Sequence, residues 1–252
     1  MYRLQLIVHP KGADDIGVIS KRLHGFIFKA IQRIDPDLSA ALHDRKDRQL
    51  FSVYPLLKKK EIRIHSPEKN VISCLQQYFL QDPQIDINDW KGEVQEVKSR
   101  YFSTEMIDQA FSSRFTLRFL TPTTFYQWGN YYPLPELQRL FSSAIKIYEI
   151  CGYRDIQWEE LEFFIRKMRI EHVSVTTHRV NFGKFNIIGF RGSLTLNMKE
   201  LPPEKQKQIW RMVVYTSLMG FGYKTAWGMG QTRLEPFEDL QTPSVSVNLW
   251  GC

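Results

Sequence analysis

The sequence predicts an α+β fold in which strand, helix, strand, strand, helix and strand follow one another twice. Short runs rich in Leu, Ile and Val at 2–9 and 114–120 indicate strands. Apolar residues at three- and four-residue steps over 16–34 indicate a helix with one buried face. The order is that of the ferredoxin-like fold, and 252 residues suit two such units of about 126 residues each.

The first unit is predicted over residues 1–110. A strand at 2–9 leads to the helix at 16–34, which ends at Asp35-Pro36 because a residue before proline leaves the helical region. The remaining elements follow in order: a short helix at 38–42, strands at 49–56 and 61–65, a helix at 68–80, and a strand at 85–97 that is interrupted at 89–92.

The second unit is predicted over residues 111–252. Its first strand, 114–120, ends in the turn Thr121-Pro122-Thr123. The next elements are helices at 136–148 and 158–166, strands at 171–177 and 186–197, a helix that Pro202 and Pro203 open and that runs to about 217, and a strand at 230–235. No self-similarity accompanies the repeat, so the duplication rests on element order.

Composition narrows the class of protein. With 43% hydrophobic and 24% charged residues, the chain is neither disordered, collagenous nor a disulfide scaffold. Cys74, Cys151 and Cys252 lie far apart and form no CxxC pair, which predicts reduced thiols in a cytoplasmic protein. The first residues indicate a strand instead of a signal peptide, and no apolar run is long enough to cross a membrane. Lys and Arg (34) outnumber Asp and Glu (27), which allows a polyanionic partner.

The stretch before the last predicted strand carries two glycine pairs. Gly220 and Gly222 are separated by five residues from Gly228 and Gly230, with Lys224 between the pairs. Glycine adopts positive φ and lets a backbone approach a ligand, so exposed amides and Lys224 could bind phosphate oxygens. The pattern fits neither a P-loop nor GxGxxG. The alternative is a tight connection between helix and strand.

This glycine motif resembles the signature near the carboxyl end of the CRISPR-associated endoribonucleases, RAMP-superfamily proteins that cut CRISPR precursor RNA within its repeats. Three other segments are similar in order and spacing: Leu42-His43-Asp44 before Leu50-Phe51-Ser52, the strand end Phe119–Thr123, and 186–196 before a helix. The resemblance implies two tandem ferredoxin-like domains. It also implies a reaction without metal or cofactor, in which a ribose 2′-OH attacks the adjacent phosphate and leaves a 2′,3′-cyclic phosphate and a free 5′-OH.

His43 is the leading catalytic candidate. An imidazole suits proton transfer because its ordinary pKa, about 6.5, lies near working pH. Arg45, Lys46 and Arg48 follow it and suit the negative charge that develops on the phosphate. In the family that the chain resembles, a histidine occupies this position. The alternative is a solvent-exposed loop histidine.

His24 is the second catalytic candidate, because helical spacing places it one turn before Phe28. The alternative is a histidine that flanks a packed helix face. Some members of the resembled family carry a tyrosine on this helix, whereas Phe28 has no hydroxyl. The place of the family's lysine is taken by Gln49, which leaves Lys46 or Arg48 as substitutes.

Two further groups in the second unit could contact RNA. Basic residues that could line an RNA groove, in addition to the glycine motif, are Arg179, Lys184 and Arg191. Aromatic residues that could stack on unpaired bases, or else pack internally, are Tyr126, Trp128, Tyr131 and Tyr132.

The resemblance thus predicts an endoribonuclease that binds and cleaves CRISPR repeat RNA. The main alternative is a catalytically silent RAMP protein that binds RNA within a CRISPR effector complex, and a weaker one is a general RNA-binding adaptor. The expected partner is repeat RNA. Effector-complex subunits and a second copy of the chain are further candidates, and no membrane is expected.

Overall fold

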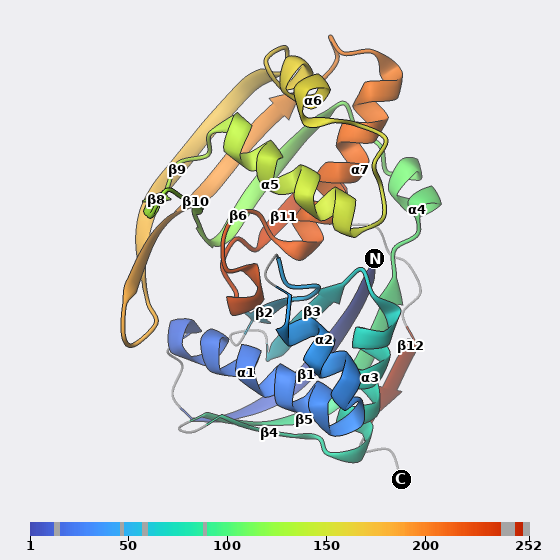
Figure 1. The fold of residues 1–252 in the computed structure, drawn as a ribbon, viewed down its shortest axis with the longest axis vertical. Helices are drawn as coiled ribbons and strands as arrows, with labels where there is room; N and C mark the ends of the chain where they lie inside the picture. The colour runs from blue at the N-terminus through green and yellow to red at the C-terminus, as the bar shows by residue number, and fades with distance from the viewer. Residues whose placement is uncertain (13–15, 46–47, 57–59, 88–89, 238–244, 249–252) are drawn as a thin grey trace. The chain divides into compact units, whose positions relative to one another are not determined.

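The computed structural model describes residues 1–12, 16–45, 48–56, 60–87, 90–237 and 245–248 (Figure 1). Two compact units make up the chain. Unit 1 comprises Met1–Tyr101, Ala226–Gly228 and Thr242–Cys252, and unit 2 comprises Phe102–Thr225 and Met229–Gln241. Two late segments of the chain therefore belong to unit 1, whereas the sequence suggests one boundary at residue 110.

Unit 1 is a ferredoxin-like unit, as predicted. Its elements are β1 (Tyr2–Gly12), α1 (Ile16–Ile34), α2 (Pro36–His43), β2 (Ser52–Leu56), β3 (Glu61–Ser66), α3 (Lys69–Gln81), β4 (Gln84–Ile87), β5 (Trp90–Tyr101) and β12 (Val245–Asn248). The sheet order is β12-β5-β1-β3-β2, with β4 paired to β5. The four strands β5-β1-β3-β2 are antiparallel neighbours, and α1 and α3 supply the two helices of the repeat.

Two details of this sheet differ from the prediction. The strand expected at 85–97, with an interruption at 89–92, is two antiparallel strands, β4 and β5, which pair with Ile87 opposite Trp90. Trp90 is buried at the start of β5, against the position where Gly92 has no side chain. Beyond residue 235, where the sequence predicts no element, the chain contributes β12, whose Val245 pairs with Ser99 of β5.

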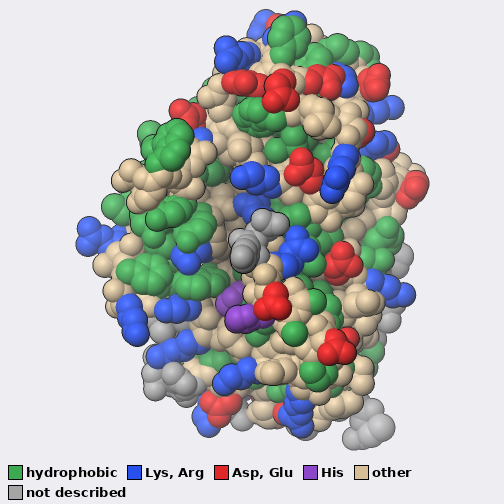
Figure 2. Space-filling view, viewed as in Figure 1, with side chains coloured by type: hydrophobic (Ala, Val, Ile, Leu, Met, Phe, Trp, Pro, Cys, Tyr) green, Lys and Arg blue, Asp and Glu red, His purple; other side chains and the backbone are tan. Residues whose placement is uncertain are grey.

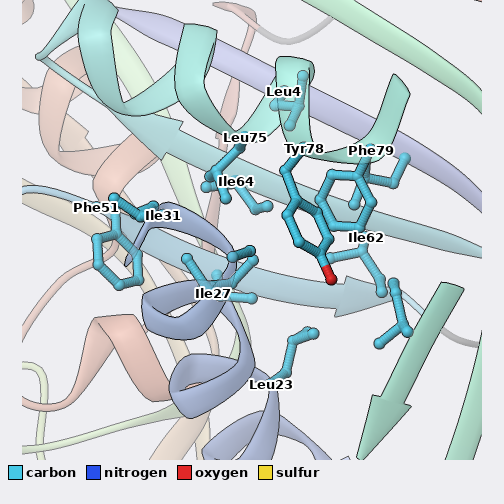
Figure 3. Close-up of a cluster of buried hydrophobic side chains, with 14 of the residues drawn as sticks. Leu4, Leu23, Ile27, Ile31, Phe51, Ile62, Ile64, Leu75, Tyr78 and Phe79 are labelled. Carbon is cyan, nitrogen blue, oxygen red and sulfur yellow. The ribbon is translucent and has the colours of Figure 1, made fainter. Parts of the chain in front are cut away.

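The core of unit 1 forms where the helices cover the sheet. Side chains four residues apart on α1, Leu23, Ile27 and Ile31, are fully buried, as the apolar spacing predicts. Figure 3 shows them meeting side chains of α3 and of strands β1 and β3 in one cluster. Burial of each such side chain contributes about 1.5–3 kcal/mol, so the orientation of α1 on the sheet is strongly determined.

Unit 2 repeats the same topology. Its elements are α4 (Thr104–Gln109), β6 (Arg114–Thr123), β7 (Phe125–Gln127), β8 (Asn130–Tyr132), α5 (Leu137–Ile150), α6 (Trp158–Ile165), β9 (Arg169–Asn181), β10 (Asn186–Asn197), α7 (Pro203–Met219) and β11 (Thr232–Glu235). The sheet order β11-β6-β10-β9 matches β5-β1-β3-β2 of unit 1. Helices α5 and α7 pack against each other (Figure 1). The predicted α+β fold with two tandem ferredoxin-like units is confirmed.

Unit 2 also contains short elements that the sequence does not predict. Helix α4 has six residues and is capped by the Ser103 hydroxyl, which accepts from the Met106 amide. Strands β7 and β8 have three residues each and, among the strands that the structure describes, pair only with one another. All three are too short to show a periodic apolar pattern. Within the described residues, every helix falls short of the length and apolar character that a bilayer crossing requires.

His65 of β3 is buried, with 5% of its surface exposed. Neither ring nitrogen has a hydrogen-bond partner among the described residues. Burial, followed by the positive charges of Arg3, Arg63 and the amino terminus, holds the pKa of His65 well below its ordinary value. The folded protein therefore keeps this imidazole neutral, whereas the unfolded chain protonates it near pH 6.5.

This histidine should make the free energy of unfolding pH-dependent. Below about pH 6.5 the unfolded state binds one more proton than the folded state at this site, so stability should fall by up to about 1.4 kcal/mol per pH unit. Urea unfolding at pH 7.5 and 5.5 should show a smaller loss for His65→Phe than for the wild type. A matched change at the exposed His172, His172→Phe, should leave the loss unchanged. Equal losses in all three proteins would contradict the assignment.

Candidate active site

His43 is the last residue of α2 and is exposed. The helix begins after Asp35, whose carboxylate accepts from the Leu38 amide at 2.9 Å, and it runs one residue beyond the predicted end at 42. His43 therefore belongs to the helix and not to the loop that follows it. The Asp44 amide donates to the Ala40 carbonyl at 3.0 Å, so regular helical geometry fixes the backbone beside His43.

The two predicted histidines contact the same aromatic ring. The His24 ring lies 5.0 Å from the Phe28 ring, centroid to centroid, and the His43 ring lies 6.0 Å from it. Both contacts are edge-to-face, with interplanar angles of 77° and 81°. In Figure 2, histidine side chains form one patch on the displayed face of unit 1. The structure thus brings together two side chains that lie on different helices.

His24 is half-buried among aromatic rings. Its ring stacks on Phe51 at 5.5 Å and lies 6.0 Å from Trp227. The Lys21 ammonium lies 5.4 Å from the centre of the Trp227 ring. Trp227 follows Ala226, which is buried in the core of unit 1. Sequence reasoning did not identify Phe51 and Trp227 as residues of this site, although Trp227 stands between the two glycine pairs.

Two arginines follow His43 closely. Arg45 is half-buried, and its Nε has no hydrogen-bond partner among the described residues. Burial lowers the pKa of the Arg48 guanidinium to about 10, which still leaves it positively charged at pH 7. Lys46 lies outside the described residues. The part of the chain that the structure describes contains no group of three or more His, Cys, Asp or Glu that could hold a metal ion.

The four glycines of the glycine motif are buried. The Gly220 amide donates to the Thr216 carbonyl at 2.7 Å and the Gly222 amide to the Ser143 hydroxyl at 2.8 Å. The Gly230 amide donates to the Pro122 carbonyl at 3.1 Å. Three of the amides expected at phosphate therefore already have protein acceptors, and the tight-connection alternative accounts for these glycines.

Close backbone approach explains why glycine is needed in this motif. Gly222 has φ +83° and Gly230 has φ +67°, values that side chains disfavour. A Cβ on Gly222 would collide with the Thr124 carbonyl oxygen, and one on Gly230 with the Phe221 carbonyl oxygen. The half-buried residues of the motif, with surface left to offer a ligand, are Tyr223, Lys224 and Trp227.

The predicted RNA-binding cations of unit 2 lie on the β9–β10 hairpin. Arg179 is opposite Ile188 and Arg191 is opposite Thr176 in the strand register, and Lys184 lies in the connecting turn. All three are exposed. The Lys224 ammonium lies 5.8 Å from the centre of the Phe185 ring, so the glycine motif places a fourth cation beside this turn.

The aromatic residues predicted as one cluster divide into three groups. Tyr126 and Tyr131 face each other across β7 and β8 at 5.2 Å. The Tyr132 ring lies under the Arg139 guanidinium at 3.7 Å. Trp128 stands apart in the turn, with 85% of its surface exposed.

Two ferredoxin-like units and a glycine motif beside the last strand are the features that the resemblance to RAMP proteins implies. The family model for the CRISPR-associated endoribonuclease Cas6 matches residues 117–232. A CRISPR-associated endoribonuclease Cas6 of Streptococcus thermophilus is 24% identical, over 95% of this chain and 98% of the relative. These matches confirm the resemblance to the CRISPR-associated endoribonucleases that the sequence motifs indicate.

Solved structures agree in fold. A product complex of Thermus thermophilus Cas6 superposes with a TM-score of 0.78 at 22% identity, over 92% of this chain and 98% of that chain. A RAMP protein described as binding different RNA substrates has a TM-score of 0.63 at 16% identity, over 93% and 99% of the two chains.

The glycine motif yields a prediction that separates packing from ligand binding. Gly230→Ala should lower the free energy of unfolding by about 1–3 kcal/mol, because the new Cβ meets backbone at positive φ. Gly25→Ala is the control, since it lies on the exposed face of α1 with open space around it, and it should stabilise by roughly 0.5–1 kcal/mol. Thermal and urea unfolding measure both. A Gly230→Ala protein of wild-type stability that binds RNA weakly would instead favour a direct phosphate contact.

Proposed function

We propose that this protein is a metal-independent endoribonuclease that cleaves CRISPR precursor RNA once within each repeat. A ribose 2′-OH attacks the adjacent phosphorus, the bond to the 5′-oxygen breaks, and the products carry a 2′,3′-cyclic phosphate and a 5′-OH. The observation that carries the proposal is the meeting of His24 and His43 at the Phe28 ring. The Cas6 domain and the relative named as an endoribonuclease support it.

The reaction requires two proton transfers at opposite sides of the phosphorus. One group takes the proton of the 2′-OH, and another gives a proton to the departing 5′-oxygen. Phe28 has no ionisable group, so it can orient its neighbours by packing but cannot exchange protons. His43 and His24 come from separate helices and contact this one ring, which gives the site two imidazoles. His43, the exposed one, is the principal acid–base group in this proposal, and His24 is its complement.

The arginines that follow His43 supply positive charge for the phosphate. At pH 7 the Arg48 guanidinium stays protonated, since its pKa of about 10 lies well above that pH. A guanidinium removed from water attracts an anion more strongly than a solvated one. The shielded Nε of Arg45 is a second donor, and Lys46 remains a candidate from its sequence position.

Binding of the rest of the RNA falls to the cations of unit 2. Arg179, Lys184 and Arg191 are exposed along β9, β10 and their turn, and Lys224 lies beside that turn. In this proposal they contact the phosphate backbone, and the glycines act by fixing the path of the chain around Lys224. Each phosphate neutralised in a single strand should add about −0.7 to the slope of log affinity against log salt.

The acid–base role of His43 is testable by substitution. His43→Ala should slow cleavage of repeat RNA by about 10²–10⁴-fold, the usual contribution of an acid–base group, while RNA affinity changes little. Single-turnover cleavage and filter binding measure the two effects. His172→Ala, a change at an exposed histidine of β9, is the control and should cut normally.

Two companion measurements sharpen this result. His24→Phe keeps an aromatic ring in the packed position and removes the imidazole, so it should also slow cleavage. A wild-type rate in that variant would remove His24 from the chemistry. RNA with a 2′-deoxy at the cut position should bind but resist cleavage. Wild-type protein that binds repeat RNA without cutting any of it would establish the alternative, a silent RNA-binding RAMP protein.

Metal independence is tested separately. Cleavage should proceed at its full rate in excess EDTA, because the proposed proton transfers and charge stabilisation use side chains alone. The same preparation assayed with added Mg²⁺ should show no faster chemical step. A rate that collapses in EDTA and returns with Mg²⁺ would contradict the proposed mechanism.

A further inference from the structure

The β7–β8 hairpin presents a tryptophan in an unusual backbone conformation. Its two strands are joined by Trp128 and Gly129, with φ values of +47° and +80°. Two-residue hairpin turns of this kind favour Asn or Asp before Gly, since positive φ strains larger side chains. Trp128 nevertheless occupies the first position, with 85% of its surface exposed. Packing within unit 2 does not explain this choice.

The hairpin is held firmly at its base. The Arg139 guanidinium of α5 covers the Tyr132 ring at 3.7 Å, donates to the Gln127 side chain, and pairs with Glu136. On the other side, the Tyr223 amide donates to the carbonyl of Thr124, directly before β7, at 2.8 Å. These contacts hold the residues on both sides of the Trp128 turn in place, which lowers the conformational entropy lost when a ligand binds.

Further aromatic surface adjoins the turn. Tyr126 and Tyr131 pair across the hairpin and are 46% and 37% exposed. The Tyr223 ring stacks on Tyr126 at 5.1 Å and 18°. The Lys224 ammonium lies 4.8 Å from the centre of the Tyr223 ring. Figure 2 shows hydrophobic side chains gathered on the side of unit 2 where β8, β9 and β10 run, with Lys and Arg among them.

Aromatic rings interspersed with cations match the chemistry of unpaired nucleotides. Bases stack on aromatic faces, and the phosphates between them bind lysine or arginine. Glu136, the carboxylate beside this surface, is already paired with Arg139, so it opposes a polyanion only weakly. A protruding indole suits insertion beside a base better than it suits a flat apolar protein surface, for which the neighbouring cations would be a desolvation cost.

We propose that Trp128, Tyr126, Tyr131 and Tyr223 form a stacking platform for unpaired nucleotides of the RNA substrate. Trp128 is the main contact, and Lys224 binds the adjoining phosphate. The platform rests on the proposed function in that RNA is its ligand. It is separate from the chemistry, because none of its members belongs to the histidine site.

The test is binding of a repeat RNA that carries a 2′-deoxy at the cut position, so that cleavage does not interfere. Trp128→Asn places a residue that tolerates positive φ in the turn, so the fold should be kept. Affinity by fluorescence anisotropy should fall about 5- to 150-fold, the range for loss of one stacked base. Trp128→Phe should recover most of it. Phe163→Asn, a change at another exposed aromatic beside a lysine, should have no effect.

An RNA with abasic nucleotides tests whether Trp128 contacts the bases. When the unpaired nucleotides are replaced by abasic ones, the phosphates remain, so wild type and Trp128→Asn should bind equally well. The salt dependence of binding should be the same in both proteins, because no charge is lost. If Trp128→Asn bound the RNA that keeps all its bases as tightly as the wild type does, the platform would be overturned. The hairpin would then be a contact for a protein partner. Failure of the proposed function would look different: RNA would bind through Trp128 but never be cut.

Discussion

The architecture of unit 2 depends on the close approach of the glycine motif to the end of β6. Backbone hydrogen bonds join Gly230 to Pro122 at 3.1 Å and Tyr223 to Thr124 at 2.8 Å. Such contacts leave no room for a Cβ at Gly222 or at Gly230. The glycine motif suggests direct phosphate binding from its sequence. In this fold, however, its glycines are needed so that two backbone segments can pack closely. In the proposed function, RNA binding falls to the side chains that the motif holds in place.

In unit 1, a single residue between two helices positions the histidine pair. The Asp35 amide donates to Ile31 at the end of α1, and its carboxylate caps α2. One residue thus ends the first helix and begins the second. Because α2 is short and folds back, the Ser39 hydroxyl reaches the Phe28 carbonyl at 3.4 Å and His43 reaches the Phe28 ring. Both imidazoles then contact one aromatic ring, that of Phe28.

The sequence predicts the features that depend on residues close together in the chain. Apolar periodicity placed the helix at 16–34 and the strand at 186–197 with the bounds that the structure has, since each buries a regular face. It missed α4 and the β7–β8 hairpin, which are too short to repeat a periodic pattern, and β12, whose partner is far away in the chain. His24 and His43 could be nominated from residue chemistry. The contact of Trp227 with His24 could not, because tertiary packing alone brings position 227 to α1.

The ion pairs of unit 2 indicate which part of its sheet keeps the excess of positive charge. Three arginines of its sheet are neutralised by glutamates: Arg114 by Glu171, Arg118 by Glu235 and Arg169 by Glu200. Among the described residues, Arg179, Lys184 and Arg191 have no such ion pair. Exposed pairs add little stability, but they cancel the local field, so the β9–β10 hairpin keeps positive charge that favours a polyanion. Because Lys224 adjoins that hairpin through Phe185, the electrostatic attraction and the aromatic surface meet at the same edge of unit 2.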